Sequence, residues 1–236
     1  MSDRALAIAV LIAALAFAAS PVIFPEFAGY RPDLFPIPQE SPPVQPAGWA
    51  FSIWGGIYAW LILGAGYGFW RHADDGDWRP MRLWLLASLG VGFFWIPVAN
   101  RLPGLATVMI LVMMATAVTA MIRAGRGHPW LESRPVALYA GWLTAASGVS
   151  IGVWLGGHGW LSPQLAAILC LIGIAGAALA IQSRRPLEWA YPAAVIWALV
   201  GVVAANAPRG NWVIVVLAAL AAIALSGLIW QAYARR

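Results

Sequence analysis

The residues that most often carry chemistry in proteins are sparse in this chain and form no catalytic arrangement. The histidines His72, His128 and His158 fall between apolar stretches, and none belongs to a paired-histidine metal motif. A single axial haem or metal ligand from His158 is the one alternative left open. Cys170 is the single cysteine, which excludes a disulfide framework and a cysteine-based metal centre. With no nucleophile–base pair or phosphate-binding loop in the sequence, we expect no catalytic residue, no metal site and no enzyme.

Aromatic side chains are the remaining candidates for a functional site. Phe51, Trp54 and Tyr58 follow the spacing i, i+3, i+7, which places them on one face of a helix. Glycines in the same segment leave room for a flat ligand or for close helix packing. An aromatic pocket with few polar groups suits a large, flat, apolar ligand, held by ring stacking and by one hydrogen bond from Asn100. The candidate ligand-binding residues are Trp49, Phe51, Trp54, Tyr58, Trp95, Asn100, Tyr139 and Trp142.

The high tryptophan content also has a simpler explanation. Tryptophan is enriched where a membrane helix meets the lipid headgroups. Of the 15 tryptophans, eight lie near the ends of predicted helices: Trp49, Trp70, Trp78, Trp130, Trp160, Trp189, Trp212 and Trp230. The deeper tryptophans could equally line a ligand site or pack between helices; these are Trp54, Trp95, Trp142 and Trp197.

The elements that must position these residues are membrane helices. Of the 236 residues, 62% are hydrophobic and only 10% are charged, whereas soluble domains are about one quarter charged. A helix crosses a bilayer with roughly 20 apolar residues. The sequence therefore predicts an all-α polytopic membrane protein with about eight transmembrane helices. Their ranges are 5–24, 47–70, 81–100, 103–122, 135–156, 161–182, 187–206 and 211–234.

The placement of arginine predicts the orientation. Lysine is absent, and on an eight-helix path eleven of the 14 arginines fall on one side, against Arg31, Arg101 and Arg209 on the other. Because cytoplasmic loops hold the excess of basic residues, we expect an integral protein of a bacterial inner membrane with both termini cytoplasmic. The arginines are dispersed, so nucleic acid is not an expected partner. The absence of lysine excludes a retinal Schiff base, and the lack of ionisable residues within the spans disfavours ion-coupled transport.

This orientation places residues 25–46, the one long connection, outside the cell. The segment contains seven prolines, which prevent a continuous helix and favour stiff extended segments. Phe24, Phe27, Tyr30 and Phe35 could anchor it on the helix bundle. A loop of this length is typical of a lid or binding loop, although it could also merely cover the helix ends.

Residues 46–58, PAGWAFSIWGGIY, resemble the tryptophan-rich sensory protein (TspO/translocator protein) family. The family's P-x-G-W-x-F opening and later W-x-x-x-Y fall here on Pro46, Gly48, Trp49, Phe51, Trp54 and Tyr58. Residues 135–155 also resemble the fifth helix of longer bacterial members, so the resemblance covers about the first 155 residues. The family's third helix has an asparagine followed by a tryptophan, whereas the order here is Trp95 then Asn100.

The resemblance implies a five-helix bundle that binds porphyrins, sterols or similar molecules under a lid formed by the first loop. We therefore divide the chain into a TspO-like bundle, 1–156, and three additional transmembrane helices, 157–236. The expected function is a non-catalytic receptor or sensor-like protein that requires no cofactor, with a tetrapyrrole as a candidate bound ligand. A porphyrin-modifying activity would leave no motif and stays open.

Two other functions stay open at this point. One is a structural or assembly subunit of a larger membrane complex, and the other is an uncoupled transporter of small hydrophobic molecules. The expected partners are membrane lipid and a hydrophobic small molecule. The glycine- and alanine-rich segment 166–180 would also suit a homodimer or a larger complex.

Overall fold

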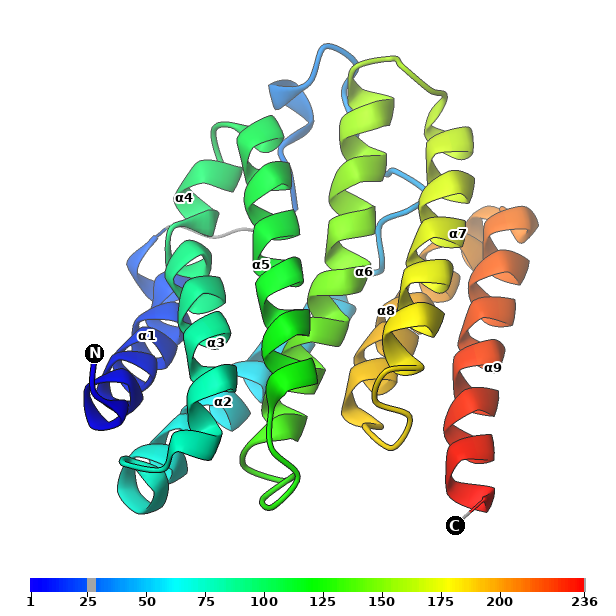
Figure 1. Cartoon of the computed structure of the whole chain (residues 1–236). Coiled ribbons are helices and arrows are strands. Elements are labelled where there is room, and N and C mark those ends of the chain that lie inside the picture. Colours follow the sequence, from blue (N-terminus) through cyan, green and yellow to red (C-terminus); the bar gives the residue numbers. More distant parts are fainter. Residues whose placement is uncertain (25–28, 236) are drawn as a thin grey trace.

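The computed structural model describes residues 1–24 and 29–235, and all regular secondary structure in this part of the chain is helical. Most of the long helices lie side by side as a bundle (Figure 1). Four short 3-10 turns cover Pro32–Leu34, Gly48–Ser52, Gly76–Trp78 and Ala207–Arg209. The α-helices are α1 (Asp3–Ile23), α2 (Ile53–His72), α3 (Arg79–Phe93), α4 (Trp95–Ala99), α5 (Pro103–Arg123), α6 (Ser133–Gly157), α7 (Pro163–Gln182), α8 (Ala190–Asn206) and α9 (Trp212–Ala234).

Seven helical segments in the described part are long and apolar enough to cross a membrane. They correspond to seven of the eight predicted spans, so the predicted all-helical membrane fold is confirmed. The third predicted span, 81–100, is instead divided at Phe94 into the shorter helices α3 and α4. In Figure 1, α4 continues beyond the upper end of α3, so the two together take the place of this third predicted span.

Pro97 explains why this span is broken. Proline has no backbone N–H, and its ring clashes with the carbonyl of the residue four positions earlier, which is Phe93. The helix therefore stops at Phe93, and the carbonyl that Pro97 cannot bond accepts a hydrogen bond of 3.0 Å from the Ser20 hydroxyl of α1. A backbone carbonyl in lipid needs such a partner.

The two termini lie at the same end of the bundle. Arg79 of α3 donates to Asp3 at 2.6 Å, which joins the N-terminus to the turn between α2 and α3. Near the C-terminus, the Tyr233 hydroxyl donates to the Leu187 carbonyl at 3.1 Å, in the turn between α7 and α8. We call this the arginine-rich end, because ten described arginines lie there: Arg4, Arg71, Arg79, Arg82, Arg123, Arg126, Arg134, Arg184, Arg185 and Arg235. The opposite end, which carries the long loop, is the loop end.

Helix α6 forms the centre of the bundle. It packs against α2, α5, α7 and α8, and 72% of its most apolar stretch is buried within the protein. Helix α9 lies at the periphery (Figure 1), and only 17% of its corresponding stretch is buried. Leu220, Ile223 and Trp230 of α9 are each more than half exposed, which suits a helix that faces lipid.

Small residues bring α6 and α8 into close contact. A Cβ added at Gly141 of α6 would clash with the carbonyl oxygen of Tyr191 in α8 and lie 3.0 Å from the Cβ of Ala194. Close approach of this kind is the usual way in which membrane helices pack tightly.

This contact yields a stability prediction. We expect Gly141→Ala to lower the melting midpoint in detergent, measured by tryptophan fluorescence, because overpacking costs about 1–3 kcal/mol. Gly173→Ala in α7 is the matched control, since an added Cβ there meets nothing within 4 Å. Its midpoint should stay unchanged or rise, because alanine favours a helix. Equal midpoints for the two variants would contradict the α6–α8 packing described here.

Candidate ligand-binding site

A cavity of about 60 Å³ lies toward the loop end, between the long loop and helices α5, α6 and α8. Four of the eight predicted site residues line it, namely Phe51, Trp54, Trp95 and Trp142. Tyr30 and Ser150 add hydroxyl groups to a lining that is otherwise mostly apolar. The cavity therefore has the aromatic walls and sparse polar groups that suit a flat apolar ligand.

Contacts between aromatic rings form the wall of the cavity on the side of α2 and α6. The Trp54 ring is 6.1 Å from the Trp142 ring in an edge-to-face arrangement, and Phe51 meets Trp142 in the same way at 5.7 Å. Below them, Tyr58 stacks on Trp54 at 5.2 Å. Phe17 of α1 packs edge-on against Trp54 and Tyr58, at 5.8 and 5.2 Å. Each ring is thus fixed by its neighbours before any ligand arrives.

The break in the third span positions Trp95. This residue begins α4, directly after the break, and its indole N–H donates to the Ala106 carbonyl of α5 at 2.9 Å. Its ring also meets the Tyr30 ring edge-on at 6.3 Å. The same irregularity that divides the helix therefore brings an indole ring to the cavity.

Residues 29–47, which we call the lid, close the cavity from outside. The lid passes over the upper ends of α5 and α6 (Figure 1), and its Ile37 N–H donates to the Gly157 carbonyl at 2.9 Å. The Tyr30 hydroxyl is 2.6 Å from the Ser150 hydroxyl, which is itself 2.8 Å from the Thr107 hydroxyl. Burial raises the pKa of Tyr30, so this hydroxyl stays protonated at neutral pH. The lid thus contributes one aromatic ring and one hydroxyl to the cavity.

Helix α8 holds the inner part of the lid. The Asn206 amide donates to the Pro43 carbonyl at 2.9 Å, and the Ala47 N–H donates to the Gly201 carbonyl at 3.0 Å. Just beyond the lid, the Trp197 indole donates to the Ala50 carbonyl at 2.8 Å. Ala198 of the same helix also lines the cavity. A helix from the part predicted to be additional therefore belongs to the structure around this site.

A comparison of the sequence with models of protein families identifies the family of this chain. The sequence model of a family described as TSPO-like protein matches residues 39–230. The chain belongs to the TSPO-like family. The match begins in the lid and ends in α9, so it covers most of the chain and extends over both of the parts predicted from the sequence. No curated protein and no solved structure gives a significant match.

The other four predicted site residues of this TSPO-like protein lie outside the cavity lining. Tyr139 is fully buried, and its hydroxyl is 3.0 Å from that of Ser88. Tyr139 and Tyr58 both contact the Trp54 ring, at 6.3 and 5.2 Å. Trp49 is 47% exposed and packs edge-on against Trp197 at 5.0 Å. Asn100 follows the end of α4, and its backbone N–H donates to the Ile96 carbonyl at 3.1 Å.

Several residues that line the cavity were not among the predicted site residues. Tyr30 carried a signal, because an aromatic residue in a proline-rich loop was already expected to lie on the bundle. Gln45, Val149 and Ala198 also line the cavity. The two apolar residues carried no signal, since they do not differ in type from the lipid-facing residues around them.

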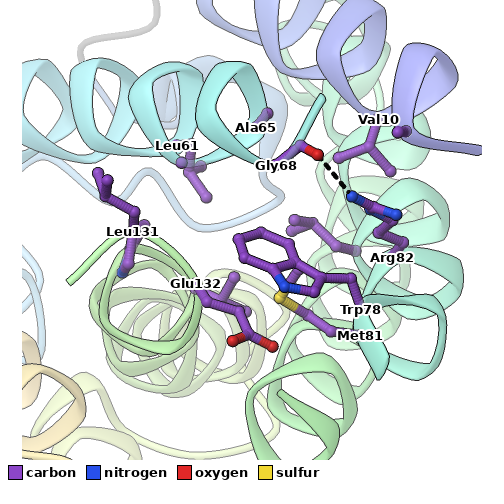
Figure 2. Close-up of a pocket in the computed structure, with 14 residues that line it drawn as sticks. Val10, Leu61, Ala65, Gly68, Trp78, Met81, Arg82, Leu131 and Glu132 are labelled. Carbon is purple, nitrogen blue, oxygen red and sulfur yellow. Dashed lines mark hydrogen bonds between the residues drawn. The ribbon is translucent and has the colours of Figure 1, made fainter. Parts of the chain in front are cut away.

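A second, smaller cavity lies near the arginine-rich end, between α1, α2, α3 and the start of α6. Its volume is about 20 Å³, close to that of one water molecule. Figure 2 shows Trp78 and Met81 projecting into this region and Arg82 beside the backbone of α2, where Arg82 donates to the Gly68 carbonyl at 2.8 Å. This cavity is a packing gap and no candidate for an organic ligand.

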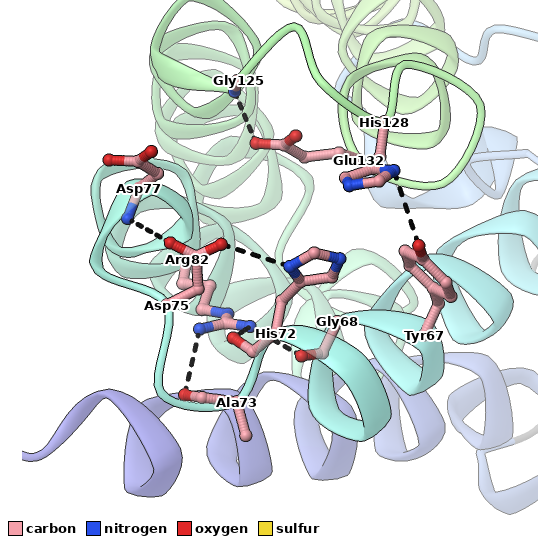
Figure 3. Close-up of polar contacts among 10 residues, drawn as sticks. All are labelled: Tyr67, Gly68, His72, Ala73, Asp75, Asp77, Arg82, Gly125, His128 and Glu132. Atoms are coloured by element: carbon pink, nitrogen blue, oxygen red, sulfur yellow. Dashed lines mark hydrogen bonds and ion pairs between the residues drawn. The ribbon is translucent and has the colours of Figure 1, made fainter.

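A polar cluster adjoins this small cavity (Figure 3). His72 is 3.1 Å from the Asp75 carboxylate, and the ring of His72 lies 4.6 Å from that of His128. Glu132 accepts a hydrogen bond from the Gly125 N–H at 2.5 Å. Within the described residues, no three side chains of the types that bind metals are grouped to hold an ion. The cluster joins the turns that follow α2 and α5.

His158 lies outside the aromatic cavity, although it is at the loop end. Its Nδ1 is 3.0 Å from the Trp154 carbonyl, and its ring packs against those of Trp154 and Phe35. If His158 were an axial ligand of a haem or a metal, that site would therefore lie outside the cavity beneath the lid.

Proposed function

We propose that this TSPO-like protein is a membrane receptor that binds a flat hydrophobic ligand, such as a tetrapyrrole, beneath the lid. The observation that carries the proposal is the meeting of Phe51, Trp54, Trp95 and Trp142 around one cavity. These rings come from separate segments of the chain, and they would stack on or pack against a planar ligand. The hydroxyls of Tyr30 and Ser150 would supply hydrogen bonds at one edge.

The size of the cavity implies that the lid moves when a ligand binds. Small-molecule sites usually measure roughly 300–1,000 Å³, whereas this cavity has about 60 Å³ in the closed arrangement. A tetrapyrrole would fit only if the lid withdrew from α6 and α8. Withdrawal would break the hydrogen bonds of Tyr30, Pro43 and Ala47. Coupling ligand entry to a change in the lid suits a receptor or sensor.

The proposed role is binding without a chemical step, and it requires no cofactor beyond the ligand itself. The polar side chains near the cavity are few, and the Tyr30, Ser150 and Thr107 hydroxyls form one hydrogen-bonded chain. These groups would orient a ligand by donating or accepting hydrogen bonds.

We further propose that the arginine-rich end faces the cytoplasm of a bacterial cell, with the lid outside its inner membrane. Ten described arginines lie at that end and three, Arg31, Arg101 and Arg209, at the other. An excess of this size is typical of cytoplasmic loops.

Ligand binding is tested by titrating protoporphyrin into the protein in mild detergent and recording tryptophan fluorescence. We expect saturable quenching, and Trp54→Leu should weaken the affinity about fivefold, because the loss of one aromatic contact costs about 1 kcal/mol. Trp160→Leu is the matched control, since Trp160 is at the loop end but is 69% exposed and lines no part of the cavity. Absent quenching, or equal affinities for the two variants, would contradict the proposed site.

The orientation is tested by cysteine labelling in a Cys170→Ala background. Ser41 in the lid and Ser183 at the arginine-rich end are both exposed, so either is accessible when changed to cysteine. A maleimide that cannot cross membranes should label Ser41→Cys in intact cells and Ser183→Cys only after the cells are permeabilised. The reverse pattern would show that the protein is inserted the other way round.

A further inference from the structure

A third cavity, of about 370 Å³, opens at the arginine-rich end, far from the lid. It lies between the turn before α6, the turn before α8 and the end of α9. Three arginines and one glutamate line it, namely Arg126, Arg134, Arg185 and Glu188. The cavity therefore carries an excess of positive charge in a protein with few charged residues.

The buried arginine of this cavity is fixed in place and still has a free donor. Arg185 is only 8% exposed, and its Nη2 donates to the Met121 carbonyl at 2.8 Å and to the Ala124 carbonyl, at the end of α5. Its Nε, however, has no hydrogen-bond partner among the described residues. A buried donor without an acceptor costs free energy, so this arrangement favours an added acceptor.

Arg134 is held in a similar way by aromatic rings. Its guanidinium lies over the Trp130 ring at 4.1 Å and near the Trp189 ring at 5.7 Å. Its Nη1 is also buried and has no hydrogen-bond partner in the described part of the chain. Two guanidinium groups that line one cavity thus each retain an unused N–H donor.

The glutamate is close enough to Arg134 and Arg185 to attract them but makes no direct ion pair with either. Glu188 is 7% exposed, and one of its carboxylate oxygens accepts a hydrogen bond of 2.6 Å from the Ser133 hydroxyl. Its other oxygen has no partner, and no ion pair between described residues joins Glu188 to an arginine. Burial raises the pKa of Glu188, whereas the Ser133 hydrogen bond and the charges of Arg185 and Arg134 act to lower it.

The arginines also repel one another. Burial is the main cause that lowers the pKa of Arg185; the nearby Glu188 carboxylate raises this pKa, and the positive charge of Arg126 lowers it. An anion bound between the arginines would relieve this repulsion. Its oxygens would also accept hydrogen bonds from the unused N–H groups.

We propose that this cavity binds a phosphate group, carried by an anionic lipid headgroup or by a soluble phosphate compound. Guanidinium groups match the geometry of phosphate oxygens with paired N–H donors. Tryptophans such as Trp130 and Trp189 commonly mark the level of the lipid headgroups, which is where a phosphate would be met. The inference does not depend on the ligand proposed for the lid cavity, because the two sites share no lining residue.

The test uses the full-length protein in a neutral detergent without phosphate, with the melting midpoint followed by tryptophan fluorescence. Sodium phosphate is titrated against sodium chloride of equal ionic strength. In parallel, short-chain phosphatidic acid is titrated against diacylglycerol of the same chain length, which lacks the phosphate. We expect at least one of the two phosphate ligands to raise the midpoint saturably above its control.

Matched variants locate the site. Arg126→Gln and Arg134→Gln should each weaken the apparent affinity about tenfold, as the loss of a charge-assisted hydrogen bond would. Arg126 is exposed, so its variant should fold even if Arg134→Gln does not. Arg184→Gln is the control, because Arg184 is also exposed and is adjacent to Arg185 in sequence but does not line the cavity. Its affinity should match that of the wild type.

The outcomes separate the two sources of phosphate. Saturation by sodium phosphate indicates a soluble ligand, and a response to phosphatidic acid alone indicates a lipid headgroup. The proposal is overturned if neither ligand exceeds its control. It is also overturned if Arg184→Gln weakens binding as much as Arg126→Gln, since the effect would then be one of overall charge.

Discussion

Within a membrane, every backbone N–H and C=O group must find a partner inside the protein, and this constraint shapes the whole loop end. The chain leaves regular helix there at Pro97 and along the lid. At each place a side chain from a long helix supplies the missing hydrogen bond: Ser20 bonds the Phe93 carbonyl, and Asn206 bonds the Pro43 carbonyl. The irregular backbone at this end is thus supported by α1 and α8, and the aromatic cavity lies beside it.

At the arginine-rich end, charged side chains supply the hydrogen bonds that the backbone carbonyls need. Arg82 donates to the Gly68 and His72 carbonyls near the end of α2, and Arg185 donates to the Met121 and Ala124 carbonyls at the end of α5. The carbonyl end of a helix carries partial negative charge, so a cation stabilises it. One end of the protein therefore buries rings and hydroxyls, whereas the other buries guanidinium groups. The two proposed ligands differ accordingly, being a flat apolar molecule and a phosphate.

The sequence predicted the helices well because the length of an apolar run reflects the thickness of the membrane. Residues 103–122 and 135–156 were predicted, and α5 and α6 cover Pro103–Arg123 and Ser133–Gly157. The break at Phe94 was missed because the effect of Pro97 depends on whether another helix can bond the freed carbonyl. In the site, Trp54 and Tyr58 lie in α2 and stack on each other, whereas Phe51 lies in the 3-10 turn before this helix. Helical spacing predicts the direction of a side chain but not how deep in the bundle it lies. Tyr58 therefore lies below the cavity, and the contribution of α8 could be found only from the packing.

If a ligand reaches the aromatic cavity only when the lid withdraws, a disulfide that holds the lid closed should block binding reversibly. A Cβ at Gly152 of α6 would lie 3.4 Å from the Cβ of Val44 in the lid, close to the roughly 3.8 Å of a disulfide. In a Cys170→Ala background, Val44→Cys with Gly152→Cys should therefore form a disulfide when oxidised. We expect the oxidised protein to lose most of its protoporphyrin binding and reduction to restore it. Equal binding by the oxidised and reduced forms would contradict it.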